Sequence, residues 1–149
     1  LFKGDEYRRA IKQRLEIGPP IPPRAEPLRG ARIVVAWKDG PEARRAVSAV
    51  LPLIHDADEV FVATVGADAG HEGTKDVAGH LARHGARVTT HLLRTAGNEG
   101  GEILNFAMRQ DADLIVMGAY GHSRLREWIF GGVTRDAVER SPVCCLMSH

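Results

Sequence analysis

Short apolar runs alternate with segments of helical periodicity along this chain. The runs lie at residues 32–37, 59–65, 86–93, 114–117 and 143–147 and predict five strands. The segment between the first two runs places apolar residues at 43, 46, 47, 50, 51 and 54, a helical spacing. Further helices are expected at 71–84, after Asn98, and at 133–140. Strands that alternate with helices predict an open, doubly wound α/β fold around a parallel five-stranded sheet.

Glycine, proline and asparagine mark where these elements begin and end. Gly40 and Pro41 suit the start of the first helix, Pro52 is expected to kink its last turn, and Gly85 to end the second helix. Asn98 is a candidate cap for the third helix. The inner face of that helix is expected to carry Ile103, Leu104, Ala107 and Met108. Alternating side chains at 86–93 indicate a half-exposed edge strand.

The first 30 residues differ in character from the rest. A helix is expected over residues 1–17, where Tyr7, Ile11 and Leu15 form a narrow apolar stripe beside several basic residues. A proline-rich linker follows, so the sequence divides into an arm at 1–30 and a domain at 31–149. The basic surface of the arm is either a solvated helix face, which is favoured, or a contact for an anionic partner.

A glycine-rich stretch follows the fourth predicted strand. Gly118 and Gly121 come directly after the apolar run, and Gly131 and Gly132 precede the last predicted helix. Glycines allow backbone N–H groups to approach a ligand closely, and a helix N-terminus offers unpaired donors with a partial positive charge. This combination is typical of a phosphate-binding site. The simpler alternative, that the glycines only form turns, fits the long spacing less well.

The spacing Gly118-x2-Gly121-x9-Gly131 resembles the nucleotide loop of the universal stress protein family, whose pattern ends in serine or threonine. Here Gly132 occupies that last position. The resemblance extends over residues 31–149. It implies the adenine nucleotide alpha hydrolase-like fold with strand order 3-2-1-4-5. It also implies an ATP ligand, with or without magnesium, bound where the ends of the first and fourth strands meet.

Most candidate nucleotide-binding residues follow from matching the family pattern to this sequence. The full set is Ala36, Trp37, Lys38, Val65, Met117, Gly118, Gly121, Arg124, Gly131, Gly132, Val133 and Thr134. Arg124 is included because its guanidinium could reach phosphate oxygens. The alternative, an exposed arginine on a surface loop with no ligand contact, is equally supported. Family members that bind ATP have an acidic residue after the first strand, where this chain has Lys38. An ammonium group accepts no hydrogen bond, and Asp39 could substitute only if the turn shifts.

No catalytic residue or metal site is expected. His122 and Ser123 are neighbours, but a nucleophile also needs an orienting group and an oxyanion hole, and neither a nucleophile elbow nor a Walker A loop is present. His80 and His84 have metal-ligand spacing without a third ligand nearby, which favours a solvated helix face. Cys144 and Cys145 are adjacent in a predicted strand, so their side chains should point to opposite faces as reduced thiols.

Charge and hydropathy narrow the choice of partners. The net charge of +1 gives no reason to expect nucleic acid, and no apolar run approaches the roughly 20 residues that span a bilayer. The expected location is the cytoplasm. The short apolar strand at 143–147 is expected to pair with a second copy or with a tandem domain. Two hypotheses stay open: a nucleotide-binding stress or signalling module, and a degenerate interaction domain that binds no nucleotide.

Overall fold

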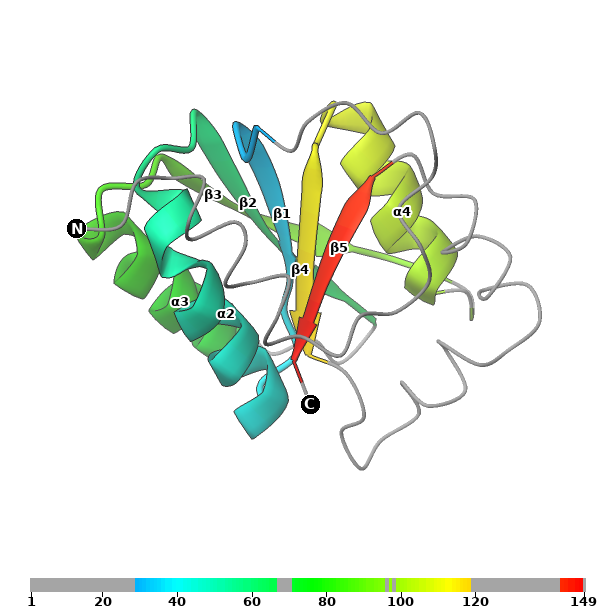
Figure 1. Ribbon diagram of the computed structural model, residues 1–149. Helices are drawn as coiled ribbons and strands as arrows, with labels where there is room; N and C mark the ends of the chain where they lie inside the picture. The colour runs from blue at the N-terminus through cyan, green and yellow to red at the C-terminus, as the bar shows by residue number, and fades with distance from the viewer. Residues whose placement is uncertain (1–28, 67–70, 96, 98, 119–142, 149) are drawn as a thin grey trace.

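The computed structural model describes residues 29–66, 71–95, 97, 99–118 and 143–148. Five strands form one all-parallel sheet in the order β3-β2-β1-β4-β5 (Figure 1). The strands are β1 (Arg32–Ala36), β2 (Glu59–Val65), β3 (Val88–Leu93), β4 (Leu114–Gly118) and β5 (Cys144–Ser148). The predicted α/β class, the parallel sheet and the order 3-2-1-4-5 are therefore confirmed.

Three helices lie within the described residues: α2 (Pro41–Ile54), α3 (His71–Arg83) and α4 (Glu99–Arg109). In Figure 1, α2 and α3 cover one face of the sheet and α4 covers the other. Gly40 precedes α2, Pro41 opens it, and the helix continues through Pro52 to Ile54. The predicted helices at 1–17 and 133–140 and the cap at Asn98 lie outside the described residues.

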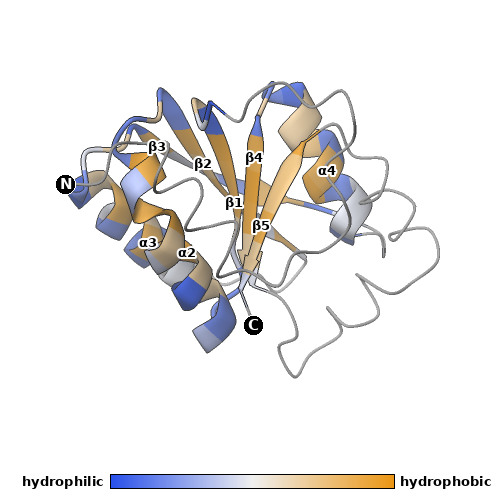
Figure 2. Ribbon diagram, viewed as in Figure 1, coloured by the Kyte–Doolittle hydropathy of each residue, from blue (hydrophilic) through white to orange (hydrophobic). Residues whose placement is uncertain are grey.

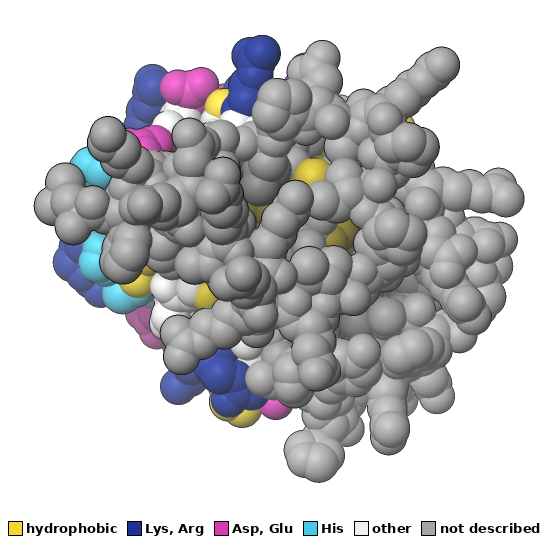
Figure 3. All heavy atoms as spheres, in the orientation of Figure 1, with side chains coloured by type: hydrophobic (Ala, Val, Ile, Leu, Met, Phe, Trp, Pro, Cys, Tyr) yellow, Lys and Arg dark blue, Asp and Glu magenta, His cyan; other side chains and the backbone are white. Residues whose placement is uncertain are grey.

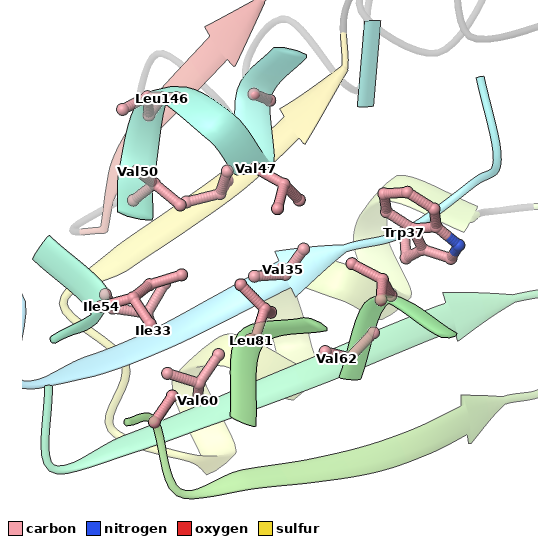
Figure 4. Close-up of a cluster of buried hydrophobic side chains, with 14 of the residues drawn as sticks. Ile33, Val35, Trp37, Val47, Val50, Ile54, Val60, Val62, Leu81 and Leu146 are labelled. Atoms are coloured by element: carbon pink, nitrogen blue, oxygen red, sulfur yellow. The ribbon is translucent and has the colours of Figure 1, made fainter. Parts of the chain in front are cut away.

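The central strand β1 supplies side chains to two separate hydrophobic cores. Ile33, Val35 and Trp37 belong to the core beneath α2 and α3, and Figure 4 shows them in a row along the strand. Val34 and Ala36 face the core beneath α4. Figure 2 shows the same division, with hydrophobic strands in the middle and hydrophilic residues on the outer sides of the helices. A parallel strand covered on both faces accounts for the continuous apolar run in the sequence.

The inner face of α4 differs from the prediction. Gly100, Ile103, Phe106 and Ala107 are buried, whereas Met108 is 53% exposed. Leu104 is only half-buried. The reason is the ring of Phe106, which packs edge-on against Phe61 with 6.2 Å between centroids and lies 4.8 Å from the His91 ring. An aromatic pair of this kind rotates the helix so that Phe106, and not Met108, faces the sheet.

The two outer strands behave partly as expected. β3 is an edge strand with a mostly exposed pattern, and its Leu92 is 39% exposed. On β5, Cys144 packs against the α2 and α3 core and Cys145 against the α4 core, so the predicted opposite orientation of the two side chains is confirmed. Burial, with a smaller contribution from Cys144, raises the pKa of Cys145 to about 12. That thiol therefore stays protonated at neutral pH and is a poor nucleophile.

Long-range polar contacts join the strands at the amino end of the sheet. The Asp113 carboxylate accepts hydrogen bonds from the backbone N–H groups of Ala31 (3.1 Å) and Arg32 (3.2 Å). The Arg32 guanidinium donates to the Gln110 carbonyl at 2.6 Å and forms an ion pair with Glu59. These contacts connect β1, β2 and the turn before β4, and they fix the start of the central strand.

We expect Asp113→Ala to lower the free energy of unfolding by about 1–3 kcal/mol, because two partly buried N–H groups lose a charged acceptor. Asp58→Ala is the matched control, since the Asp58 side chain is exposed, and it should change stability by no more than about 0.5 kcal/mol. Urea denaturation followed by circular dichroism measures both variants. Equal stability of the two variants would show that the Asp113 contacts contribute nothing.

Candidate functional site

The carboxyl ends of β1 and β4 meet at the point where the strand order reverses. α2 leads from β1 to β2 on one face, and α4 leads from β3 across to β4 on the other. Ligands of open α/β sheets bind at such a switch point. In the strand register Ala36 lies between Met117 of β4 and Ala63 of β2. Ala63 is two residues before Val65, the last residue of β2. The register thus places Ala36, Met117, Gly118 and Val65 at the same edge of the sheet, and their roles toward a nucleotide stay predictions.

Gly118 ends β4 directly against the first turn of α2. A Cβ atom at Gly118 would lie 2.6 Å from the Ala43 backbone nitrogen and 3.0 Å from the Glu42 carbonyl carbon. No side chain caps this helix at Gly40. The first N–H groups of any helix lack intrahelical partners, so this end of α2 adds donors and a partial positive charge to the crevice. Gly118 is therefore required by helix packing, whether or not a ligand binds.

Two charged residues, Lys38 and Asp39, follow the buried Trp37 after the end of β1, and their surroundings differ. Lys38 is exposed. Both Asp39 oxygens accept hydrogen bonds from Arg44 of α2, at 3.0 and 3.1 Å. A Cβ atom at Gly73 of α3 would lie 3.8 Å from the Asp39 Cβ, so Asp39 lies on the α2 and α3 side of the sheet. The Asp39 carboxylate is therefore paired with α2, and its part in a nucleotide site stays a prediction.

A cavity that the sequence did not reveal lies between α2 and α3, beside the end of β1. Its volume is about 250 Å³, and its lining includes Trp37, Val47, Gly73, Asp76 and Val77. Trp37 is 8% exposed, and its buried indole Nε1 has no hydrogen-bond partner among the residues that the structure describes. An unsatisfied buried donor costs about 1–3 kcal/mol, which makes this group a feature that calls for an explanation. Figure 3 shows histidine and charged side chains gathered on this side of the molecule.

The remaining candidate residues lie outside the described residues. These are Gly121, Arg124, Gly131, Gly132, Val133 and Thr134. Their predicted roles toward phosphate stay predictions. Within the described part of the chain, no group of three His, Cys, Asp or Glu side chains is arranged to hold a metal ion, and His80 and His84 instead pack ring against ring at 4.8 Å. No helix among the described residues is long and apolar enough to cross a membrane.

Comparison with known proteins connects this geometry to a family. The universal stress protein family pattern matches residues 67–149, more than half of the chain. The chain belongs to the universal stress protein family. No curated protein matched the sequence. The family match includes β4, the glycine stretch and β5, and so covers the part of the chain that carries most of the candidate nucleotide-binding residues.

Solved universal stress protein structures share the fold. One from Archaeoglobus fulgidus is 22% identical with a TM-score of 0.58 and covers 79% of this chain and 97% of that one. The dAMP complex from the same organism has 21% identity and a TM-score of 0.58, covering 79% and 96%. A universal stress protein in complex with cAMP has 19% identity and a TM-score of 0.58, covering 79% and 96%. At this identity the likeness shows the fold alone.

We expect Gly118→Ala to lower the free energy of unfolding by about 1–3 kcal/mol, because the added methyl group meets the backbone of α2 rather than a movable side chain. The matched control is Gly79→Ala on α3, where the nearest atom is the flexible end of Arg83 at 3.7 Å. That change should stabilise the protein by about 0.5–1 kcal/mol through helix propensity. Thermal unfolding without nucleotide tests both, and a stable Gly118→Ala protein would contradict the packing argument.

Proposed function

We propose that this chain is a cytoplasmic module that binds an adenine nucleotide and serves a stress response or signalling role by binding rather than by catalysis. The observation that carries the proposal is Gly118 at the switch point, beside the end of β1 and against the first turn of α2. The complexes of similar universal stress proteins with cAMP and dAMP support an adenine nucleotide as the ligand.

The groups suited to phosphate are retained in the chain. The sequence keeps the glycines at 118, 121 and 131 at the family spacing. The start of α2, which has no side-chain cap at Gly40, lies against Gly118 and would add a partial positive charge. Lys38, an exposed residue shortly after β1, would add a full positive charge. We propose ATP as the preferred ligand, with magnesium accompanying its phosphates, and Arg124 as a further phosphate contact.

The nucleoside side of the proposed site is weaker. Val65 ends β2 and would offer its backbone to the adenine. The acidic residue expected after β1 is replaced by Lys38, and Asp39 is engaged with Arg44 on the other side. Gly132 also lacks the hydroxyl group that the family pattern supplies. Each lost hydrogen bond to a charged group costs about 1.5–3 kcal/mol, one to two decades in affinity, so binding should be weaker than in a member with the intact pattern.

Calorimetric titration with ATP, ADP and AMP tests the proposal. Gly131→Val should abolish binding, because a β-branched side chain would occupy the path of the phosphates. Gly132→Ser should tighten binding by about tenfold or more, because it restores one hydroxyl donor. Gly79→Ala, on α3 away from the switch point, is the control and should leave the affinity unchanged.

The absence of heat at millimolar nucleotide for both the wild type and Gly132→Ser would favour the second candidate, a degenerate interaction domain. Two observations support that candidate: Lys38 stands where the family pattern has an acidic residue, and the Asp39 carboxylate accepts hydrogen bonds from Arg44. In that case the fold would act through its surface rather than through a bound nucleotide.

We also propose that β5 pairs with a second copy of the chain or with a tandem domain of the same family. β5 is an end strand of the sheet in the described part of the chain and pairs there with β4 alone. A half-buried, apolar edge strand offers unpaired backbone groups to another strand. Light scattering of this chain should give the mass of a dimer, and a monomer at high concentration would contradict self-association.

A further inference from the structure

We propose that Glu99 selects adenine among the nucleotide bases by accepting a hydrogen bond from its 6-amino group, an inference that rests on the proposed nucleotide-binding function. Glu99 is the first residue of α4 and is exposed. A Cβ atom at Gly66 would lie 4.0 Å from the Glu99 Oε1 atom, so the carboxylate lies beside the residue that follows β2. This places an acceptor at the edge of the sheet where the base is expected.

The backbone at the end of β2 faces the same position. The Ala63 carbonyl accepts a hydrogen bond from the Trp37 N–H group at 2.8 Å, and the Gly66 N–H group donates to the Leu93 carbonyl at 3.2 Å. Successive strand residues direct their N–H and C=O groups alternately to the two neighbouring strands. Ala63 therefore faces β1, Gly66 faces β3, and Val65 faces the β1 side. Because β1 has ended at this level of the sheet, the Val65 backbone groups are placed to meet a base.

The order of the strands separates Glu99 from the proposed phosphate position. β1 lies between β2 and β4, so the end of β2 is two strand spacings, roughly 10 Å, from Gly118 at the end of β4. A carboxylate directly beside the phosphates would repel them, whereas at the end of β2 it faces the nucleoside. An ionised carboxylate only accepts hydrogen bonds, so its partner on the nucleoside must be an N–H or O–H group.

The 6-amino group of adenine has two N–H bonds and can use two acceptors. One suits the Val65 carbonyl, and the second is left for an acceptor on the α4 side of the sheet, where the Val65 side chain also packs. No ion pair between described residues includes Glu99, whereas Glu102 one turn later pairs with Arg109 at 2.9 Å. A base with a carbonyl group in place of the amino group would present an acceptor to an acceptor and be disfavoured.

Two nucleotides that differ only in the amino group provide the test. The probes are AMP and purine riboside monophosphate, which lacks the amino group, and titrations followed by proton–nitrogen correlation spectra of the ¹⁵N-labelled chain give both affinities. Glu99→Ala should reduce the preference for AMP over the second probe by about tenfold, because one hydrogen bond to a charged acceptor is lost. The Val65 backbone is the same in both proteins, so its share of the preference cancels in the comparison.

A matched variant and a third nucleotide locate the effect. Glu102→Ala makes the same chemical change on the same helix, at a carboxylate that pairs with Arg109, and should leave the preference for AMP unchanged. dAMP lacks the ribose 2′-hydroxyl group, and Glu99→Ala should weaken AMP and dAMP by the same factor, because the proposed contact is to the base. Thermal unfolding of both variants without nucleotide measures any effect of the substitutions on folding.

Two results would overturn this inference and leave the nucleotide-binding function intact. In the first, AMP binds and Glu99→Ala leaves its preference over purine riboside monophosphate unchanged. In the second, Glu99→Ala weakens AMP but not dAMP, which would place the carboxylate at the ribose. Failure of both the wild type and Gly132→Ser to bind AMP at millimolar concentration would instead refute the proposed function, and the role of Glu99 with it.

Discussion

The burial of β1 on both faces is the constraint on which the rest of this structure depends. Ile33 and Val34 are fully buried, and Val35 is 1% exposed, although successive side chains point to opposite sides of the sheet. Each core therefore receives alternate residues of a single strand, and the helices must divide between the two faces. The same alternation continues to the end of the strand, where Ala36 points to one face and Trp37 to the other. Two neighbouring residues that the family pattern assigns to one site thus have side chains on opposite faces of the sheet.

The close approach of α2 to Gly118 adds a second constraint at the same edge. The glycine allows the backbone of α2 to contact the end of β4, which places the start of α2 at the switch point. A glycine that a phosphate loop needs is here also needed by packing. Loss of nucleotide binding on replacing Gly118 would therefore not by itself identify a ligand contact.

The sequence predicted those features that depend on local periodicity. The bounds of β2 and α2 follow from the apolar runs and from Gly40 and Pro41, and the two ends of β5 differ from the prediction by one residue. The inner face of α4 was predicted correctly at Ile103 and Ala107 and wrongly at Met108. Its helical spacing allows two overlapping apolar stripes, and the packing of Phe106 on Phe61 favours the one without Met108. Such a choice depends on a strand more than forty residues away in the chain.

Contacts between distant segments account for what periodicity could not show. In the sequence Asp113 is only the residue before the fourth predicted strand. The folded sheet brings its carboxylate beside the N–H groups of Ala31 and Arg32, which are about 80 positions away in the chain. The cavity beside Trp37 likewise requires Gly73 of α3 to lie over the end of β1. The strand order and the outline of the crevice came from the family resemblance, and the order was confirmed.

The turn after β1 carries two residues of opposite charge, Lys38 and Asp39. The Asp39–Arg44 ion pair has exposed side chains, 55% and 68%, and exposed pairs contribute only about 0–1 kcal/mol. The pair is too weak to hold Asp39 against a strong competing contact. Asp39 also lies near Gly73 of α3, and Arg44 belongs to α2, so the carboxylate is on the side of the sheet that these two helices cover. In the proposed nucleotide site the nucleoside would lack an acceptor here, because Lys38 precedes Asp39 in the sequence at the position that the family pattern gives to an acid.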